Sequence, residues 1–135
     1  MESGYIYIHN NVFPTLLAIS SDEQSQGLMH RPWPPPIMSF VYATPNINKF
    51  WMRNTPSPLD IIFCHAGKVS EICYGEPHST AVIGSDRPSD LVVELPFGTA
   101  SSSDIKIGQS AGLVKPTWDE LRQIIASKSH GIVRF

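Results

Sequence analysis

The stretch KFWMRNTPSPLDIIF, residues 49–63, gathers side chains that could hold a ligand. If residues 49–53 form a strand, its side chains alternate, so Trp51 and Arg53 share the face opposite the apolar one. A guanidinium on that face can stack over the indole ring. The pattern therefore predicts an aromatic and cationic surface at one end of a strand.

Asn54 and Thr55 come next, where the strand should end, and prolines stiffen the chain before Asp60. On a structural interpretation, Asn54 and Thr55 satisfy backbone groups of a proline turn, and Asp60 accepts hydrogen bonds from those amides. On a binding interpretation, these side chains line a small pocket for a polar ligand together with Trp51 and Arg53. The sequence leaves both interpretations open.

A second carboxylate, Glu94, lies in the later apolar segment VVELP. Together with Asp60 it could divide acid and base roles, as paired carboxylates do when their environments differ. Glu94 stands between apolar residues, so alternation should turn it away from the core unless Arg31 or Arg53 pairs with it. We therefore favour a structural ion pair over an active-site acid and predict no catalytic residue.

No metal or cofactor motif accompanies these residues. The histidines are scattered, without a His-x-x-x-His or Cys-x-x-Cys pair, and the sequence has no nucleophile elbow, phosphate loop or dinucleotide fingerprint. Cys64 and Cys73 flank the turn HAGK, and a tight hairpin would place Cys73 opposite Asp60, too far from Cys64 for a disulfide. We expect buried free thiols, no metal and no cofactor.

The composition suits one domain without a nucleic-acid partner. The chain has 135 residues, a formal charge of -2 and 10 Lys and Arg spread along it, which gives no basic stripe for phosphate backbones. The N-terminal MESGYIYIHN has neither a positive leader nor a continuous apolar run. The sequence thus predicts a cytoplasmic protein with no signal peptide and no membrane contact.

Short apolar runs separated by Pro, Gly and Asn predict a mainly β (α+β) fold, a small curled antiparallel sheet or partly open β-barrel. Ser21 can cap one short helix, with Gln24 as its capping-box partner, and RPWPPP should form a rigid extended loop. In the hairpin at residues 59–74 one face should be core, including Ile72 and Tyr74, and the other half covered. Strands are expected at residues 4–10, 37–42, 49–53, 58–65, 68–74 and 90–96.

The end of the chain predicts a second helix. Thr117 and Glu120 form a capping box, and apolar residues follow at helical spacing: Trp118, Leu121, Ile124 and Ile125. We expect this amphipathic helix to pack on the sheet. The predicted organisation is a β-rich domain at residues 1–115 with a C-terminal helical extension at residues 116–135 packed on it.

Several motifs together resemble an uncharacterised family, number 192 among the domains of unknown function. They are QGLMHR, FWMRNTPSPLDIIF, the Gly of HAGKV, VVELPFGT and IKIG, and the resemblance spans roughly residues 16–112. It implies the family's single small β-rich domain, found in bacteria, archaea and some of their viruses, and it implies no function. This sequence departs from the family pattern at Arg53, usually Lys, at Ile37, usually Gly, and at Gln109, usually acidic.

The leading hypothesis is a non-enzymatic binding or accessory module, whose rim around residues 51–60 engages a small polar ligand or a protein partner, with Arg31 and Glu94 nearby. The alternative is a small hydrolase or lyase that uses one of the carboxylates as base and Asn54 or Arg53 to stabilise developing charge. A third is a structural piece of a larger assembly, such as a virus particle, which a short chain without an export signal would suit.

Overall fold

The protein is described by a computed structural model that places residues 1–114. The predicted C-terminal helix and the extension at residues 116–135 lie outside this described part. The elements are β1 (Glu2–Ile8), β2 (Asn11–Ala18), α1 (Ser21–Gln26), β3 (Met38–Ile47), β4 (Leu59–His65), β5 (Lys68–Gly75), β6 (Pro88–Pro96), α2 (Thr99–Ser102) and β7 (Ala111–Leu113).

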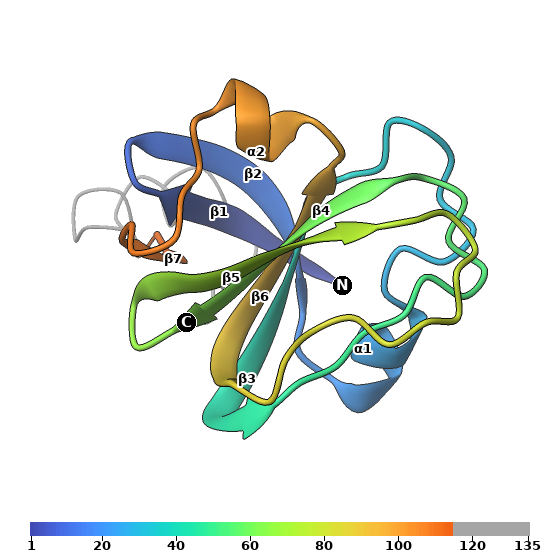
Figure 1. Ribbon diagram of the computed structural model, residues 1–135, viewed down its shortest axis with the longest axis horizontal. Coiled ribbons are helices and arrows are strands. Elements are labelled where there is room, and N and C mark those ends of the chain that lie inside the picture. Colours follow the sequence, from blue (N-terminus) through green and yellow to red (C-terminus); the bar gives the residue numbers. More distant parts are fainter. Residues whose placement is uncertain (115–135) are drawn as a thin grey trace, which may run out of the picture.

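The strands form one curled sheet of seven strands in the order β5-β4-β6-β3-β2-β1-β7 (Figure 1). Its two edges approach each other at one end, because Val69 N donates to Gln109 O at 2.9 Å and Ala111 N donates to Gly67 O at 2.9 Å. The mainly β, partly open barrel is therefore confirmed. The sheet is not purely antiparallel, however, since β2 and β3 run parallel, joined by the long connection that contains α1.

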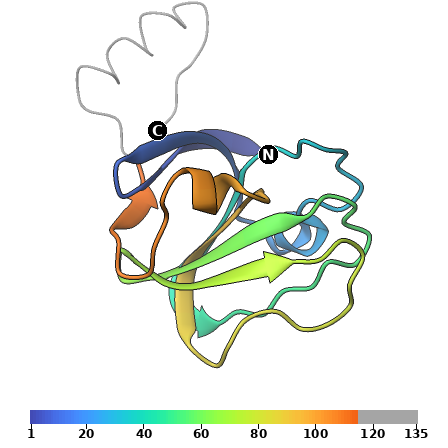
Figure 2. The ribbon, with the colours of Figure 1, turned by 45° about the horizontal axis from the view of Figure 1, so that its top comes forward.

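One predicted strand, at residues 49–53, differs from the structure. Residues 49–53 form no strand; Phe50 makes only an isolated bridge to Ile83. Ser101 and Ser102 lie in the four-residue helix α2. In both views α1 and α2 lie on different sides of the molecule (Figures 1 and 2). Residues 49–53 therefore belong to the loop between β3 and β4 and not to the sheet.

The helix α1 buries none of its residues. Hydrogen bonds of its polar side chains therefore hold it in place. Its capping box is formed by Ser20 and Glu23, one residue before the predicted pair: Ser20 Oγ accepts from Glu23 N at 3.2 Å, and Glu23 Oε1 accepts from Ser20 N at 3.0 Å. These bonds to backbone amides lower the pKa of Glu23. Gln24 is free to face the sheet, where its amide donates to Ala18 O and Val41 O.

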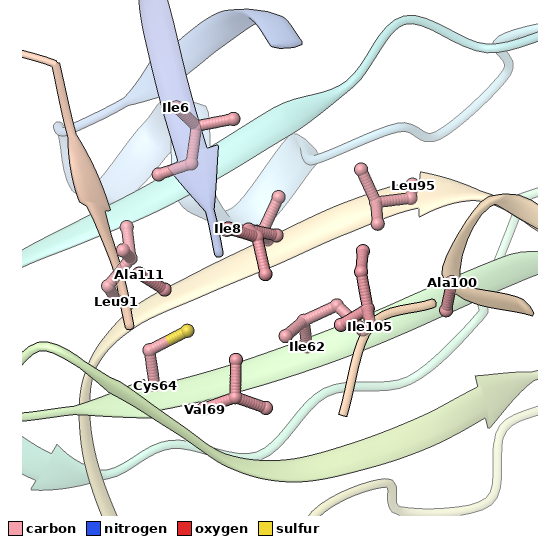
Figure 3. Packing of buried hydrophobic residues seen from close by; sticks show 11 residues of the cluster. Ile6, Ile8, Ile62, Cys64, Val69, Leu91, Leu95, Ala100, Ile105 and Ala111 are labelled. Atoms are coloured by element: carbon pink, nitrogen blue, oxygen red, sulfur yellow. The ribbon is translucent and has the colours of Figure 1, made fainter. Parts of the chain in front are cut away.

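The central strands β4 and β6 are covered on both faces. One face carries a core of buried residues that includes Ile6, Ile8, Ile62 and Val93 (Figure 3). The other carries a second core that includes Met38, Phe40, Met52, Leu59, Ile61, Phe63 and Val92. The expectation of one buried and one half-covered face for β4 is therefore wrong, and its near-continuous apolar sequence reflects burial on both sides.

The hairpin of β4 and β5 contains a bulge that reverses the predicted faces of β5. Phe63 pairs with Glu71 while Cys64 pairs with Val69, so one extra residue separates the two registers. Cys73 then lies opposite Ile61 instead of Asp60. Ile72 consequently packs in the core shown in Figure 3, whereas Tyr74 is 53% exposed. Both cysteines are free as predicted, and burial raises the pKa of Cys64 to about 12.

Gly84 is a position where a side chain would disturb the fold. Its φ is +109, and an added Cβ would lie 3.0 Å from Phe63 Cζ and 3.2 Å from Asn48 O. We expect Gly84→Ala to lower the free energy of unfolding by about 2–4 kcal/mol, combining backbone strain with steric overlap. The matched control is Gly67→Ala, whose φ is +78 with no atom within 4 Å, so that only strain remains. Urea denaturation of both variants measures the difference, and equal losses would contradict the steric part.

Candidate functional site

A cavity of about 380 Å³ opens between α1 and the loop that follows β3. The end of α1 and the turn after it form one wall, β3 and β6 form the floor, and residues 48–55 contribute the other wall. Its volume lies in the range of small-molecule sites. The lining residues are Ser21, Gln24, Ser25, Gln26, Gly27, Leu28, Met29, Phe40, Tyr42, Asn48, Lys49, Phe50, Trp51, Thr55 and Glu94.

Glu94 is the most unusual residue of this lining, because its carboxyl is placed in the core. It lies on β6 opposite Met38 of β3 and Ile61 of β4, and it is only 4% exposed. The expectation that alternation turns Glu94 away from the core is wrong, since β6 is a central strand with apolar residues on both faces. The expected ion pair with Arg31 or Arg53 is also wrong: within residues 1–114 the structure pairs Glu94 with no cation.

Burial raises the pKa of Glu94 to about 8, and loss of hydration is the cause. Near neutral pH the side chain is therefore mostly a carboxylic acid. No completely enclosed side-chain nitrogen or oxygen among residues 1–114 lacks a hydrogen-bond partner. The Glu94 oxygens make no protein hydrogen bond in the same part of the chain, so they must be open to the cavity. Beside them, burial and then the Glu94 charge raise the pKa of Tyr42 to about 12, which keeps the phenol neutral.

The loop wall is held by its own contacts. Trp51 lines the cavity, is 47% exposed, and carries the Arg53 guanidinium over its ring at 5.4 Å from the centroid, the stacking expected from the sequence. Thr55 is buried, and its hydroxyl donates to Arg53 O at 3.1 Å. The Asn48 amide donates to Ser89 O at 2.9 Å. These contacts hold residues 48–55 against β6 and against each other.

At the rim, Lys49 is the one cationic residue of the lining, and its ammonium lies 2.9 Å from Asp86 Oδ1. This pair is exposed to solvent at both ends. Solvent-exposed pairs of this kind contribute little to stability. The charge of Lys49 is thus balanced by Asp86 and does not compensate the buried carboxyl of Glu94.

Other predicted site residues lie outside the lining. Asn54 is exposed with φ 53, and its carbonyl accepts from His30 N at 2.7 Å, which gives it a role in the turn. Arg31 is exposed, and its carbonyl accepts from Ser57 Oγ at 3.1 Å. The structure therefore brings together Trp51, Thr55 and Glu94 from the predicted set, with Arg53 reaching the site through its stack on the indole.

Asp60 belongs to a different place in the fold. It lies opposite Leu95, on the face of β4 away from Glu94, and one carboxylate oxygen accepts from Gly98 N at 3.0 Å and Ala100 N at 2.9 Å. The structural interpretation of Asp60 is supported, although its amide partners are the N-cap and the first turn of α2 instead of the proline turn. Asp60 and Glu94 share no site, so the proposed division of acid and base roles between them is wrong.

Sequence reasoning missed the part of the lining that comes from α1 and β3. Gly27 has φ 49, and a Cβ there would lie 3.4 Å from Phe40 Cζ and 3.8 Å from Glu94 Oε1, so the chain passes close over the carboxyl. Gly27 belongs to the QGLMHR motif and Phe40 to a predicted strand. That motif was the available signal, but nothing in it indicates that Glu94 would lie beneath it.

Two further features are absent from the described residues. Within residues 1–114 no group of three or more His, Cys, Asp or Glu residues is placed to hold a metal ion. Among the helices that the structure describes, none is long and apolar enough to cross a membrane.

Comparison with known proteins places the chain in a family. Residues 7–113 match the profile of DUF192, described as an uncharacterised ACR. A structure of a candidate transcription regulator from Sinorhizobium meliloti aligns with a TM-score of 0.77 at 27% identity, covering 83% of this chain and 94% of that one. A protein of unknown function from Novosphingobium aromaticivorans aligns with a TM-score of 0.75 at 31% identity, covering 82% and 84%. No curated protein matches this chain. The chain belongs to the DUF192 family.

Proposed function

We propose that this chain is a non-enzymatic binding module that holds a small polar ligand in the cavity between α1 and the loop at residues 48–55. The observation that carries the proposal is the Glu94 carboxyl, which is 4% exposed and meets no hydrogen-bond or charge partner in residues 1–114. A ligand that bonds to this group would supply the missing partner.

A buried carboxyl without a partner destabilises a fold, and an apolar residue of similar size would pack there at lower cost. Glu94 is surrounded by the core of Met38, Phe40 and Ile61, so packing alone gives no reason for its charge. Functional sites are where such unfavourable groups occur. The fixed wall around Trp51 and Thr55 adds to the argument, because a site ordered in advance loses less entropy on binding.

The competing functions have less support from the geometry. The hydrolase or lyase needs a second catalytic group near Glu94, but Asp60 lies on the opposite face of the sheet and accepts backbone amides. A partner protein would favour a flat apolar patch, whereas this site is a hollow lined by polar and aromatic residues. The formal charge of -2 gives no electrostatic basis for nucleic acid as the ligand.

The proposal predicts that small polar compounds bind in this cavity and that Trp51 is needed for it. A fragment library screened by backbone amide NMR should shift the signals of Gly27, Leu28 and Thr55. Trp51→Ala should weaken the hits about tenfold or more, as loss of an aromatic anchor does. The matched control is Trp33→Ala, which removes an indole that is also exposed but does not line the cavity.

The proposal is wrong if no compound shifts those amides, or if the hits bind equally to Trp51→Ala. A third result would also count against it, namely hits confined to the apolar groove lined by Tyr5, Leu16 and Ile37.

A further inference from the structure

From the proposed binding site, on which this inference rests, we infer the chemical class of its ligand: a small organic cation whose protonated amine pairs with the Glu94 carboxylate while its carbon skeleton lies among the aromatic rings.

The walls of the cavity have the composition of a cation site. Four aromatic residues line it, Phe40, Tyr42, Phe50 and Trp51. The faces of such rings attract cations, and sites for organic ammonium groups are built from them. This protein already uses one ring in that way, since the Arg53 guanidinium lies over Trp51 at 5.4 Å from the centroid.

The charges around Glu94 also favour a cationic ligand. The elements that face it contribute few titratable groups to the lining: none from α1, Tyr42 from β3 and Lys49 from the following loop. Tyr42 stays neutral because its pKa is raised to about 12. Lys49 is paired with Asp86 at 2.9 Å, at the rim. Arg53 lies on the indole of Trp51 and is not part of the lining. An anionic ligand would therefore keep Glu94 protonated and find no cation beside it, whereas a cationic ligand would pair with the ionised carboxylate.

Pairing with a cation changes the protonation of Glu94. In the empty site, loss of hydration holds the pKa near 8, so the group carries a proton at neutral pH. When the ammonium ion binds, the carboxyl releases this proton to solvent and the ion pair forms; the ligand keeps its own proton and no covalent bond changes except the O–H bond. A neutral ligand would bind the carboxylic acid and release none. The two cases therefore differ in their dependence on pH.

The test is a titration with benzylamine and cyclohexylamine, each compared with the alcohol of the same skeleton. Methyl NMR signals of labelled methionines report binding, because Met29 lines the cavity and Met38 pairs with Glu94 across the sheet. Affinity for the amines should rise about tenfold per pH unit from about pH 6 to about pH 7 and level off above about pH 8. Affinity for the alcohols should stay constant from about pH 6 to about pH 7 and should not rise at higher pH.

Variants test which charged residues cause the pH dependence of amine binding. Glu94→Gln should remove both the pH dependence and the preference for amines over alcohols. Asp90→Asn, on the same strand but outside the lining, is the matched control and should behave as the parent protein. Lys49→Gln should bind amines about two- to threefold more tightly, since a like charge at the rim is removed. Circular dichroism and thermal melting establish that each variant is folded.

The possible outcomes separate this inference from the proposed function. If alcohols bind in the cavity as tightly as amines at every pH, the proposed binding site is retained and the inference of a cationic ligand is contradicted. If amines bind with the same pH profile to Glu94→Gln, the pairing with Glu94 is overturned. If neither class shifts the signals of Met29 and Met38, the proposed binding function falls as well.

Discussion

The parent protein should lose stability, relative to Glu94→Gln, as pH rises from about 4.5 to about 8. Burial raises the pKa of Glu94 from the unfolded value of 4.5 to about 8, so the folded protein keeps a proton that the unfolded chain releases in this window. The contribution of protonated Glu94 to the free energy of unfolding is fully present below the unfolded pKa of 4.5. It is lost as the pH approaches the folded pKa of about 8. The total change should be on the order of 5 kcal/mol.

Urea denaturation at a series of pH values checks this prediction. The difference between parent and Glu94→Gln isolates one group, because all other titrating residues are common to both proteins. Above about pH 8 the variant should be the more stable protein, since a neutral amide avoids the cost of a buried charge. A difference that stays constant with pH would show that Glu94 is hydrated in the folded state, and the argument for a ligand would lose its basis.

The regular parts of the fold could be predicted from local sequence. The β4–β5 hairpin is the best example: apolar residues mark both strands, and Ala66 and Gly67 form a two-residue connection in which both φ angles are positive, at 50 and 78. The same pattern hides the bulge beside Cys64. One inserted residue changes the faces that the side chains of β5 occupy after Val69, and it leaves no mark in the composition of the strand.

The candidate site was predicted less completely, because its parts come from distant segments. Trp51 and Thr55 stand in one motif, but Gly27 and Tyr42 reach them only after the parallel pairing of β2 with β3 folds α1 over the sheet. Glu94 was expected to face away from the core or to form a structural ion pair with Arg31 or Arg53, since an acid in an apolar strand usually faces water or a cation. That rule fails when a strand is central and both of its faces are covered.

Asp60 was predicted as a site residue, and its replacement should show that it is a structural one. Its carboxyl is 8% exposed and accepts two backbone hydrogen bonds, from Gly98 at 3.0 Å and Ala100 at 2.9 Å. Asp60→Ala leaves both amides without an acceptor, and the loss in free energy of unfolding should be about 3–5 kcal/mol. The matched control is Asp90→Ala, which removes a single bond of 3.2 Å from the exposed Ala66 amide and should cost less than about 1 kcal/mol.

Asp60→Asn separates this structural role from ligand binding. Both amides donate to the same oxygen, Oδ2, so an asparagine carbonyl can accept both, and the variant should lose only about 1–2 kcal/mol with the charge. The bonds hold Ala100 in the core of Figure 3, on the side of the sheet away from Glu94. Amine binding by Asp60→Asn should therefore match the parent protein within about twofold, since the two carboxyls are not coupled. A large loss of binding in a folded Asp60→Asn would place this carboxylate in the site after all, and the separation of the two faces of the sheet would not describe how the protein works.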